Sequence, residues 1–180
     1  MNIEQDIKKV LISAEDLDQR CRELGAQISK DYDGLNPVVI CLLKGSIVFT
    51  GKLITYINVP MELEALRLKS YDGTKSTGHV QIFDFDYNTI NKRHVIIVED
   101  IIDTGLTLKE VIKLFKSKNI KSLEVCTLLD KKVMNRVDIN PKYVGFEIPN
   151  EFVVGFGLDY NQQYRNLPYV GVLKEEAINR

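Results

Sequence analysis

The stretch Val95–Thr107, VIIVEDIIDTGLT, decides the fold of this chain. It begins with the apolar run Val95–Val98, which predicts a buried β-strand, and continues through two acids and a glycine turn. An apolar face at helical spacing follows, formed by Leu108, Val111, Ile112 and Phe115. The stretch therefore predicts a strand that turns directly into a helix, the unit from which parallel sheets are built.

The turn carries groups that suit a phosphorylated ribose. Glu99 and Asp100 are adjacent acids at a strand end, so they should have a partner, either vicinal hydroxyls or a magnesium ion held partly through water. The segment Asp103–Thr107 offers a glycine, two threonine hydroxyls and a helix N-terminus, which together favour an anion. Taken singly, each of these residues favours an ordinary turn between strand and helix, with Asp103 or Thr104 as a helix cap.

The rest of the chain alternates strands with helices. The pattern predicts helices over 13–31 and 47–57 and a mobile polar loop over 72–78. It predicts strands over 38–43, 61–71, 79–85, 122–129, 143–148, 152–154 and 169–173. We expect an α/β fold in which Lys44, Glu99–Asp100 and Lys131 converge, because the carboxyl ends of parallel strands share one sheet edge.

Composition limits the classes of protein that remain. The 180 residues, 44% hydrophobic and 27% charged, suit one folded domain with a small appended lobe. A net charge of −1 argues against nucleic-acid binding driven by overall charge. Three separated cysteines, no signal-peptide core and no run of membrane-spanning length predict a cytoplasmic protein with no membrane partner.

The whole run Val95–Thr107 resembles the phosphoribosyl-diphosphate signature of type I phosphoribosyltransferases: strand, Glu-Asp, two aliphatics, Asp-Thr-Gly, any residue, Thr. Every position matches, with Leu106 at the variable place. The resemblance implies the type I phosphoribosyltransferase fold, a mostly parallel central sheet with helices on both faces. It also implies a small hood lobe built from the N-terminal segment and residues 150–180. In this family Glu99, Asp100, Asp103, Thr104, Gly105 and Thr107 would bind the ribose phosphate.

Further stretches are most similar to the hypoxanthine (hypoxanthine-guanine) branch of that family. They are Leu43–Ser46, Arg67–Tyr71, Asp130–Lys131, and Phe152–Gly155 running on to Leu158–Asn161 and Arg165. The resemblance implies that Lys44, Gly45 and Arg165 bind pyrophosphate, with a cis peptide at Leu43–Lys44. It also implies that Ser70 and Tyr71 belong to a mobile loop that closes over the diphosphate.

The same resemblance assigns the purine site. Lys131 would donate to the 6-oxo group, Phe152 would stack on the base, Val153 would offer backbone groups, and Asp159 would border the purine. Asp103 would accept or donate the proton at purine N7, as the catalytic acid–base group. Glu99, Asp100 and Asp159 would bind Mg²⁺, the expected cofactor. Each of these residues also has an ordinary structural interpretation, as surface lysine, core aromatic or turn aspartate.

The expected activity is transfer of phosphoribose from 5-phospho-α-D-ribose 1-diphosphate to N9 of hypoxanthine or guanine. An RNA-binding regulatory relative that keeps the phosphoribosyl-diphosphate site is the main alternative, and a pyrimidine or adenine enzyme of the family is another. Side chains do not rank hypoxanthine, guanine and xanthine. The resemblance implies small-molecule substrates as partners. It also implies further copies of the chain, because dimers and tetramers are usual in the family, so we expect a homodimer or homotetramer.

Overall fold

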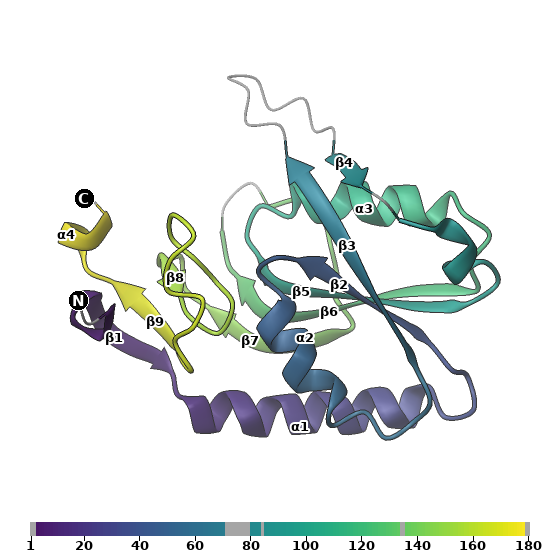
Figure 1. The fold of residues 1–180 in the computed structure, drawn as a ribbon, viewed down its shortest axis with the longest axis horizontal. Coiled ribbons are helices and arrows are strands. Elements are labelled where there is room, and N and C mark those ends of the chain that lie inside the picture. The colour runs from purple at the N-terminus through teal and green to yellow at the C-terminus, as the bar shows by residue number, and fades with distance from the viewer. Residues whose placement is uncertain (1–2, 71–79, 84, 134–135, 179–180) are drawn as a thin grey trace.

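The computed structural model describes residues 3–70, 80–83, 85–133 and 136–178. A six-stranded sheet in the order β4-β3-β2-β5-β6-β7 forms the body of the molecule (Figure 1). Its strands are β2 (Val38–Leu43), β3 (Glu62–Ser70), β4 (Val80–Phe83), β5 (His94–Ile102), β6 (Ser122–Lys131) and β7 (Tyr143–Ile148). Only β4, which pairs with β3, runs antiparallel to its neighbour. The predicted mostly parallel sheet is confirmed.

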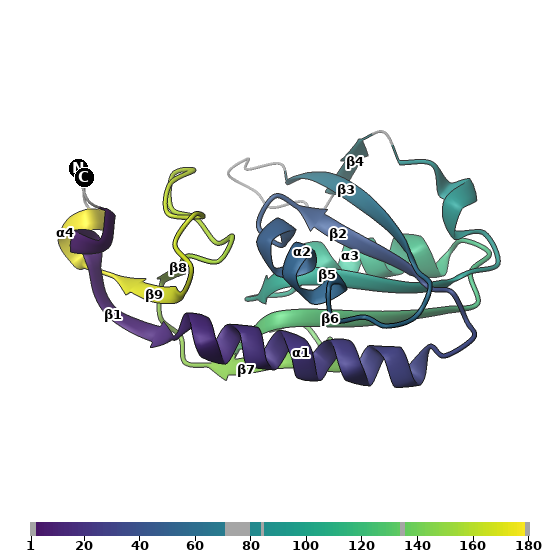
Figure 2. The same ribbon diagram turned by 60° about the horizontal axis from the view of Figure 1, so that its bottom comes forward.

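Helices cover both faces of this sheet, as predicted. The helices α1 (Ala14–Asp31) and α2 (Ile47–Ile54) lie on one face, and α3 (Leu106–Lys116) lies on the other (Figures 1 and 2). Successive side chains of a strand point to opposite faces, so β5 sends Ile96 and Val98 toward α1 and α2, and Val95 and Ile97 toward α3. All four are fully buried, which explains why this run is apolar throughout.

The helix boundaries follow from local bonding. Ser13 begins α1 by accepting the backbone N–H of Asp16 at 3.1 Å, as the capping-box pattern predicts. Helix α2 ends at Ile54, three residues earlier than predicted. There the N–H groups of Tyr56 and Ile57 turn to carbonyls three residues back, and Tyr56 packs closely on Gly25 of α1. The close packing of the two helices therefore favours a tight turn over a further helical turn.

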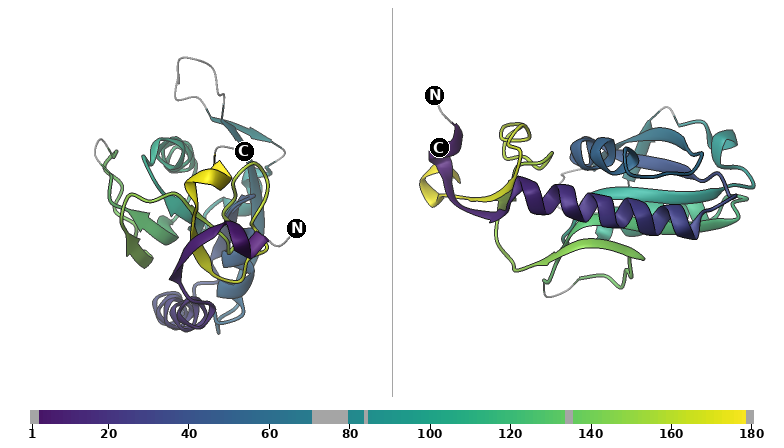
Figure 3. Two further views of the ribbon diagram at one scale, coloured as in Figure 1. Left: turned by 90° about the vertical axis from the view of Figure 1, so that its left-hand side faces the viewer. Right: turned by 90° about the horizontal axis from the view of Figure 1, so that it is seen from below.

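A second, three-stranded antiparallel sheet stands beyond the start of α1 (Figures 2 and 3). Its order is β1 (Ile7–Ile12), β9 (Val170–Leu173) and β8 (Val153–Val154), so it joins the two ends of the chain. A short helix, α4 (Glu175–Ile178), follows β9, and 3-10 turns occupy Ile3–Asp6 and Tyr87–Ile90. Strand β1 was not predicted, because its IKKVLI sequence is largely exposed and does not alternate. Within the described ranges no helix is long and apolar enough to cross a membrane.

Candidate functional site

The strand order reverses between β2 and β5. The chain moves from β2 to β3 on one side, and from β5 through β6 to β7 on the other. Pairing of β2 with β5 stops at Cys41 and Val98, whereas β5 continues beside β6 as far as Ile102 and Asp130. The two central strands therefore part at their carboxyl ends, which is where open α/β sheets bind ligands.

Glu99 and Asp100 lie where the strands part. They belong to β5 itself, because pairing with β6 carries the strand to Ile102 rather than ending it at Val98 as predicted. The N–H of Asp100 donates to Glu99 Oε1 at 3.1 Å, and the N–H of Ile101 donates to Asp100 Oδ1 at 2.8 Å. Burial and the neighbouring Asp100 carboxylate raise the pKa of Glu99 well above its ordinary value. The pair thus disfavours two adjacent negative charges and would be stabilised by a cation or by hydroxyl donors.

The turn from β5 to α3 presents backbone and hydroxyl donors. Gly105 has φ +77°, a conformation that glycine adopts without strain, and α3 begins at the next residue. Thr104 and Thr107 are both exposed beside this helix N-terminus. The N–H of Val137 donates to the Thr104 carbonyl at 3.0 Å and so supports the turn from behind. The threonine side of the turn is therefore open to a ligand, and the bond from Val137 holds the opposite side in place, as an anion site requires.

Lys131 and Asp103 come together at the ends of β6 and β5. Lys131 Nζ lies 3.6 Å from Asp103 Oδ2, and the lysine side chain is only 11% exposed while the aspartate is 53% exposed. A lysine is seldom this buried without a partner or a ligand. The surface-lysine interpretation is therefore wrong, because β6 extends through Lys131 and draws it into the sheet.

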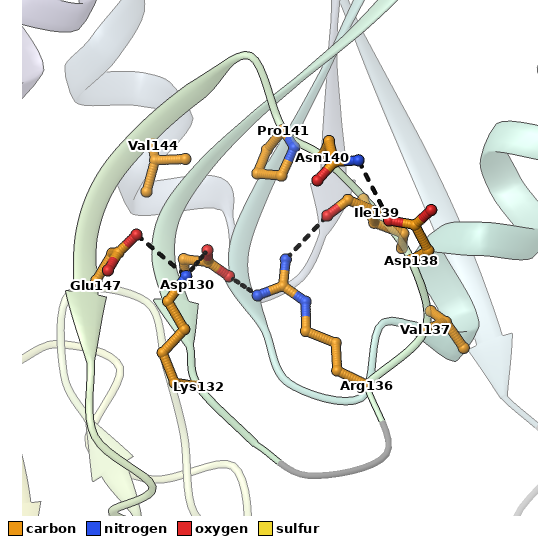
Figure 4. A pocket seen from close by; sticks show the side chains of 10 residues that line it. All are labelled: Asp130, Lys132, Arg136, Val137, Asp138, Ile139, Asn140, Pro141, Val144 and Glu147. Atoms are coloured by element: carbon orange, nitrogen blue, oxygen red, sulfur yellow. Dashed lines mark hydrogen bonds and ion pairs between the residues drawn. The ribbon is translucent and has the colours of Figure 1, made fainter.

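The residue before Lys131 points to the other face of the sheet. The buried carboxylate of Asp130 pairs there with Arg136 and, at 3.2 Å, with Lys132 (Figure 4). Arg136 also donates to the Ile139 carbonyl at 3.1 Å. These groups line an open pocket of about 530 Å³ on the far side of Lys131. They hold the 136–139 segment, which packs under Gly105 through Val137 and Ile139.

The loop after β2 faces Asp100 directly. The Leu43–Lys44 peptide is cis, as the resemblance implies. A Cβ added to Gly45 would lie 1.7 Å from Asp100 Oδ2, so a larger residue would have to displace that carboxylate. Ser46 Oγ donates to the Leu42 carbonyl at 2.7 Å and holds the turn. The loop and the acid pair thus form opposite walls of the gap between β2 and β5.

The segment 155–165 closes the same gap from the small sheet. Gly157 has φ +105°, and a Cβ there would lie 2.1 Å from the Gly45 carbonyl oxygen. Arg165 donates to the Gly157 carbonyl at 2.7 Å and pairs with Asp159 at 2.7 Å. Lys44 Nζ donates to Gln162 Oε1 at 3.3 Å. The structure therefore brings Lys44, Gly45, Asp159 and Arg165 together, and adds Gln162 and Gly157, which the sequence analysis missed.

Phe152 and Val153 differ in exposure. The Phe152 ring is 46% exposed and meets the Tyr160 ring edge-on, with centroids 5.5 Å apart. The core interpretation of Phe152 is therefore wrong. Val153 is buried and pairs with Val172 of β9, so its side chain is not exposed to a ligand.

Glu99 and Asp100 lie together, but no group of three acidic, histidine or cysteine side chains forms a metal centre in the described ranges. Asp159 is paired with Arg165 instead of joining the other two acids. Ser70 ends β3, whereas Tyr71 and the loop 72–78 lie outside the described residues.

The phosphoribosyl transferase domain model matches residues 13–161. An acid pair and a helix turn with groups that suit an anion lie at the switch point of the parallel sheet, and the chain belongs to the phosphoribosyltransferase family. Among its relatives, the hypoxanthine-guanine phosphoribosyltransferase of Streptococcus thermophilus is 49% identical, and 99% of each chain is covered. The Staphylococcus aureus enzyme of the same name is 48% identical, covering 96% of this chain and 97% of that one.

Comparison with solved structures indicates the same family. A hypoxanthine phosphoribosyltransferase from Staphylococcus aureus superposes with a TM-score of 0.93 and 47% identity, covering 97% of this chain and 96% of that one. The enzyme from Trypanosoma cruzi, in complex with the product IMP, gives a TM-score of 0.89 and 38% identity, covering 96% and 97%. The resemblance to the hypoxanthine-guanine branch is thereby confirmed.

Proposed function

We propose that this chain transfers phosphoribose from 5-phospho-α-D-ribose 1-diphosphate to N9 of hypoxanthine or guanine, giving IMP or GMP and pyrophosphate. The observation that carries the proposal is the ion pair of Lys131 with Asp103, 3.6 Å apart at adjoining strand ends. It places a buried cationic donor beside an exposed carboxylate, next to a turn suited to phosphate. A 6-oxopurine needs both groups, one for its carbonyl oxygen and one for its ring proton.

The β5–α3 turn would hold the ribose phosphate. Thr104, Gly105 and Thr107 offer hydroxyl and backbone donors at the start of α3, and the helix dipole favours the phosphate charge there. Glu99 and Asp100 would accept hydrogen bonds from the vicinal hydroxyls. The positions of these groups support the two roles, because the acids lie at one end of the short segment Glu99 to Thr107 and the threonine-bearing turn lies at the other.

The diphosphate leaving group would lie between the Lys44–Gly45 loop and Arg165. Both cations approach the gap, and an arginine fork pairs well with phosphate oxygens. Ser70 and Tyr71 are proposed to come from a lid that excludes water, because water would capture an oxocarbenium-like sugar. We further propose that the small sheet acts as the hood, since it carries Phe152 and the 155–165 segment that packs on Gly45.

In the transfer the bond from C1 of the ribose to the diphosphate oxygen breaks and the bond from C1 to purine N9 forms. The purine loses one proton, which the Asp103 carboxylate would accept at N7. Lys131 would donate to the 6-oxo oxygen, and Phe152 would stack on the base with Val153 offering backbone groups beside it. A 6-amino base would leave the buried Lys131 without an acceptor, which selects against adenine.

Magnesium fits Glu99 and Asp100 better than it fits Asp159. The first two are adjacent carboxylates, and burial together with the neighbouring Asp100 charge raises the pKa of Glu99, which a bound cation would counteract. Asp159 already has Arg165 as its cation at 2.7 Å. When bound, magnesium would neutralise charge on the diphosphate. We therefore propose Glu99 and Asp100 as the main protein ligands, directly or through water, with Asp159 acting through Arg165.

A spectrophotometric assay tests the proposal. The protein is mixed with phosphoribosyl diphosphate, magnesium chloride and one of four bases: hypoxanthine, guanine, xanthine or adenine. We expect turnover with hypoxanthine or guanine and none with adenine. Absence of turnover with every 6-oxopurine would overturn the proposed function.

A further inference from the structure

We propose that Gln162 is a positioning residue for the diphosphate: its side-chain amide oxygen gathers Lys44 and Arg165 at one point before the substrate binds. The inference rests on the proposed function, because it takes these two cations as the diphosphate site. It concerns a residue that lies in no motif singled out from the sequence.

The carrying observation is one acceptor shared by two cations. Gln162 Oε1 accepts from Lys44 Nζ at 3.3 Å and from Arg165 Nη2 at 3.3 Å. The two donors come from positions more than 100 residues apart, at the end of β2 and on the loop beside the small sheet. A single oxygen thus bridges the two walls of the proposed leaving-group site.

Gln162 is itself held firmly. Its backbone N–H donates to Asp159 Oδ2 at 2.9 Å, and its Nε2 lies 3.4 Å from the same oxygen. Asp159 pairs in turn with Arg165. Gln162 also has φ +65°, a conformation that is uncommon for a non-glycine residue and persists when surrounding contacts enforce it. The backbone therefore directs this one side chain toward the two cations.

The charge balance explains why an amide is suited to this place. Asp159 compensates Arg165, whereas Lys44 makes no ion pair with any described residue. A neutral amide oxygen orients both donors without cancelling their charge. A diphosphate oxygen is anionic and forms stronger, charge-assisted bonds, so it can replace the amide oxygen as the shared acceptor. Gln162 would then lower the cost of ordering two long, flexible side chains when the diphosphate arrives.

The test shortens the amide by one methylene. Gln162→Asn tolerates positive φ but cannot reach both cations, and Gln163→Asn makes the same change at the next position, where the side chain is exposed as it is at Gln162. For Gln162→Asn we expect KM for phosphoribosyl diphosphate and Kd for magnesium pyrophosphate to rise about 3- to 10-fold, the size of one to two weak hydrogen bonds. Both kcat and the KM for hypoxanthine should stay within about 2-fold of the wild-type values. Gln162→Gly, which removes the side chain without backbone strain, should match Gln162→Asn.

Gln162→Glu keeps an acceptor at the same reach, but its carboxylate would neutralise the two cations and compete with the anionic diphosphate, so it should not restore the pyrophosphate affinity. The inference is overturned if Gln162→Asn and Gln163→Asn give equal pyrophosphate affinity. It is also overturned if KM for hypoxanthine rises in parallel, because that would indicate general loss of structure. Calorimetric titration with magnesium pyrophosphate needs no turnover. It therefore decides the role of Gln162 even if the wild-type protein fails with every 6-oxopurine and the proposed function is wrong.

Discussion

The segment 99–107 and the segment 155–165 form two sides of one site by different means. The first is regular: its acids lie on β5, its threonines flank the start of α3, and one glycine makes the turn. The second is irregular, with positive φ at Gly155, Phe156, Gly157, Asn161, Gln162 and Tyr164. Neighbouring strands fix the first, whereas close backbone approach and side-chain bonds fix the second.

This difference in structure corresponds to a difference in proposed role: one segment carries the reactive groups, and the other positions residues around them. Segment 99–107 carries the groups proposed to bind ribose phosphate and move a proton, within a few residues of one another. Segment 155–165 carries few reactive groups, but its contacts bring Arg165 to Lys44 across the gap. Changes in the first segment should therefore lower turnover, and changes in the second should lower stability or leaving-group affinity.

The largest expected effect is on turnover in the first segment. Asp103→Asn removes the proposed proton acceptor but keeps the shape of an exposed side chain. We expect kcat to fall by about 10²- to 10⁴-fold, as for loss of a general acid–base group. Steady-state assays of this variant and of Asp33→Asn, in the exposed turn after α1, measure the effect. Near-normal turnover by a folded Asp103→Asn would remove the role.

The second largest effect, on kcat/KM for hypoxanthine, is expected for Lys131→Met. It removes the donor proposed for the 6-oxo oxygen, and a hydrogen bond from a charged donor contributes about 1.5–3 kcal/mol. The kcat/KM for hypoxanthine should therefore fall about 10- to 150-fold. Lys132→Met is the matched control, since that lysine pairs with Asp130 and Glu147 on the other face. Equal losses in the two variants would contradict a specific role for Lys131.

In the second segment, Gly157→Ala should lower stability. Alanine would be strained at φ +105°, with its Cβ 2.1 Å from the Gly45 carbonyl oxygen. We expect a loss of about 1–3 kcal/mol in the free energy of unfolding, measured with urea. Gly51→Ala, in α2 with no atom within 4 Å of the new Cβ, should instead gain up to about 1 kcal/mol. Equal changes in both variants would show that the close approach to Gly45 is not what requires glycine.

The smallest effect concerns Glu99 and pH. Its folded pKa is raised above the ordinary 4.5, so the folded protein holds a proton that the unfolded chain releases. Wild-type stability should therefore fall as the pH rises above about 4.5 toward the folded pKa. Glu99→Gln should remove this pH dependence. The variant should therefore be more stable than the wild-type protein at pH 7 and equally stable near pH 4. Urea unfolding at both pH values measures the difference, and a gap that widens toward low pH would contradict the raised pKa.

Magnesium chloride gives a second readout on the same variant. It should stabilise the wild-type protein more than Glu99→Gln, because ligands that bind only the folded state stabilise it.

Local patterns predicted most of the large sheet. Strand β2 matches its prediction residue for residue, since Val38–Leu43 is apolar and ends in a Lys-Gly turn. Strands β5 and β6 run further than predicted, because pairing between them continues past the apolar run through polar residues such as Glu99 and Asp130. Strand β1 escaped prediction, because its partner β9 lies more than 150 residues away and its side chains are mostly exposed.

The sequence by itself determined the chemistry: an acid pair, an anion-type turn and a family signature lie within Val95–Thr107, because contiguous residues on a strand–turn–helix unit hold their order in space. Only the tertiary structure decided how far apart the other groups stand. It buried Lys131 against Asp103, set Gly157 on Gly45, and brought Gln162 between Lys44 and Arg165. The contacts of Gly157 and Gln162 depend on positive backbone angles and on segments more than 100 residues apart, and the Lys131 contact depends on how far β6 runs beside β5, which local residue patterns do not encode.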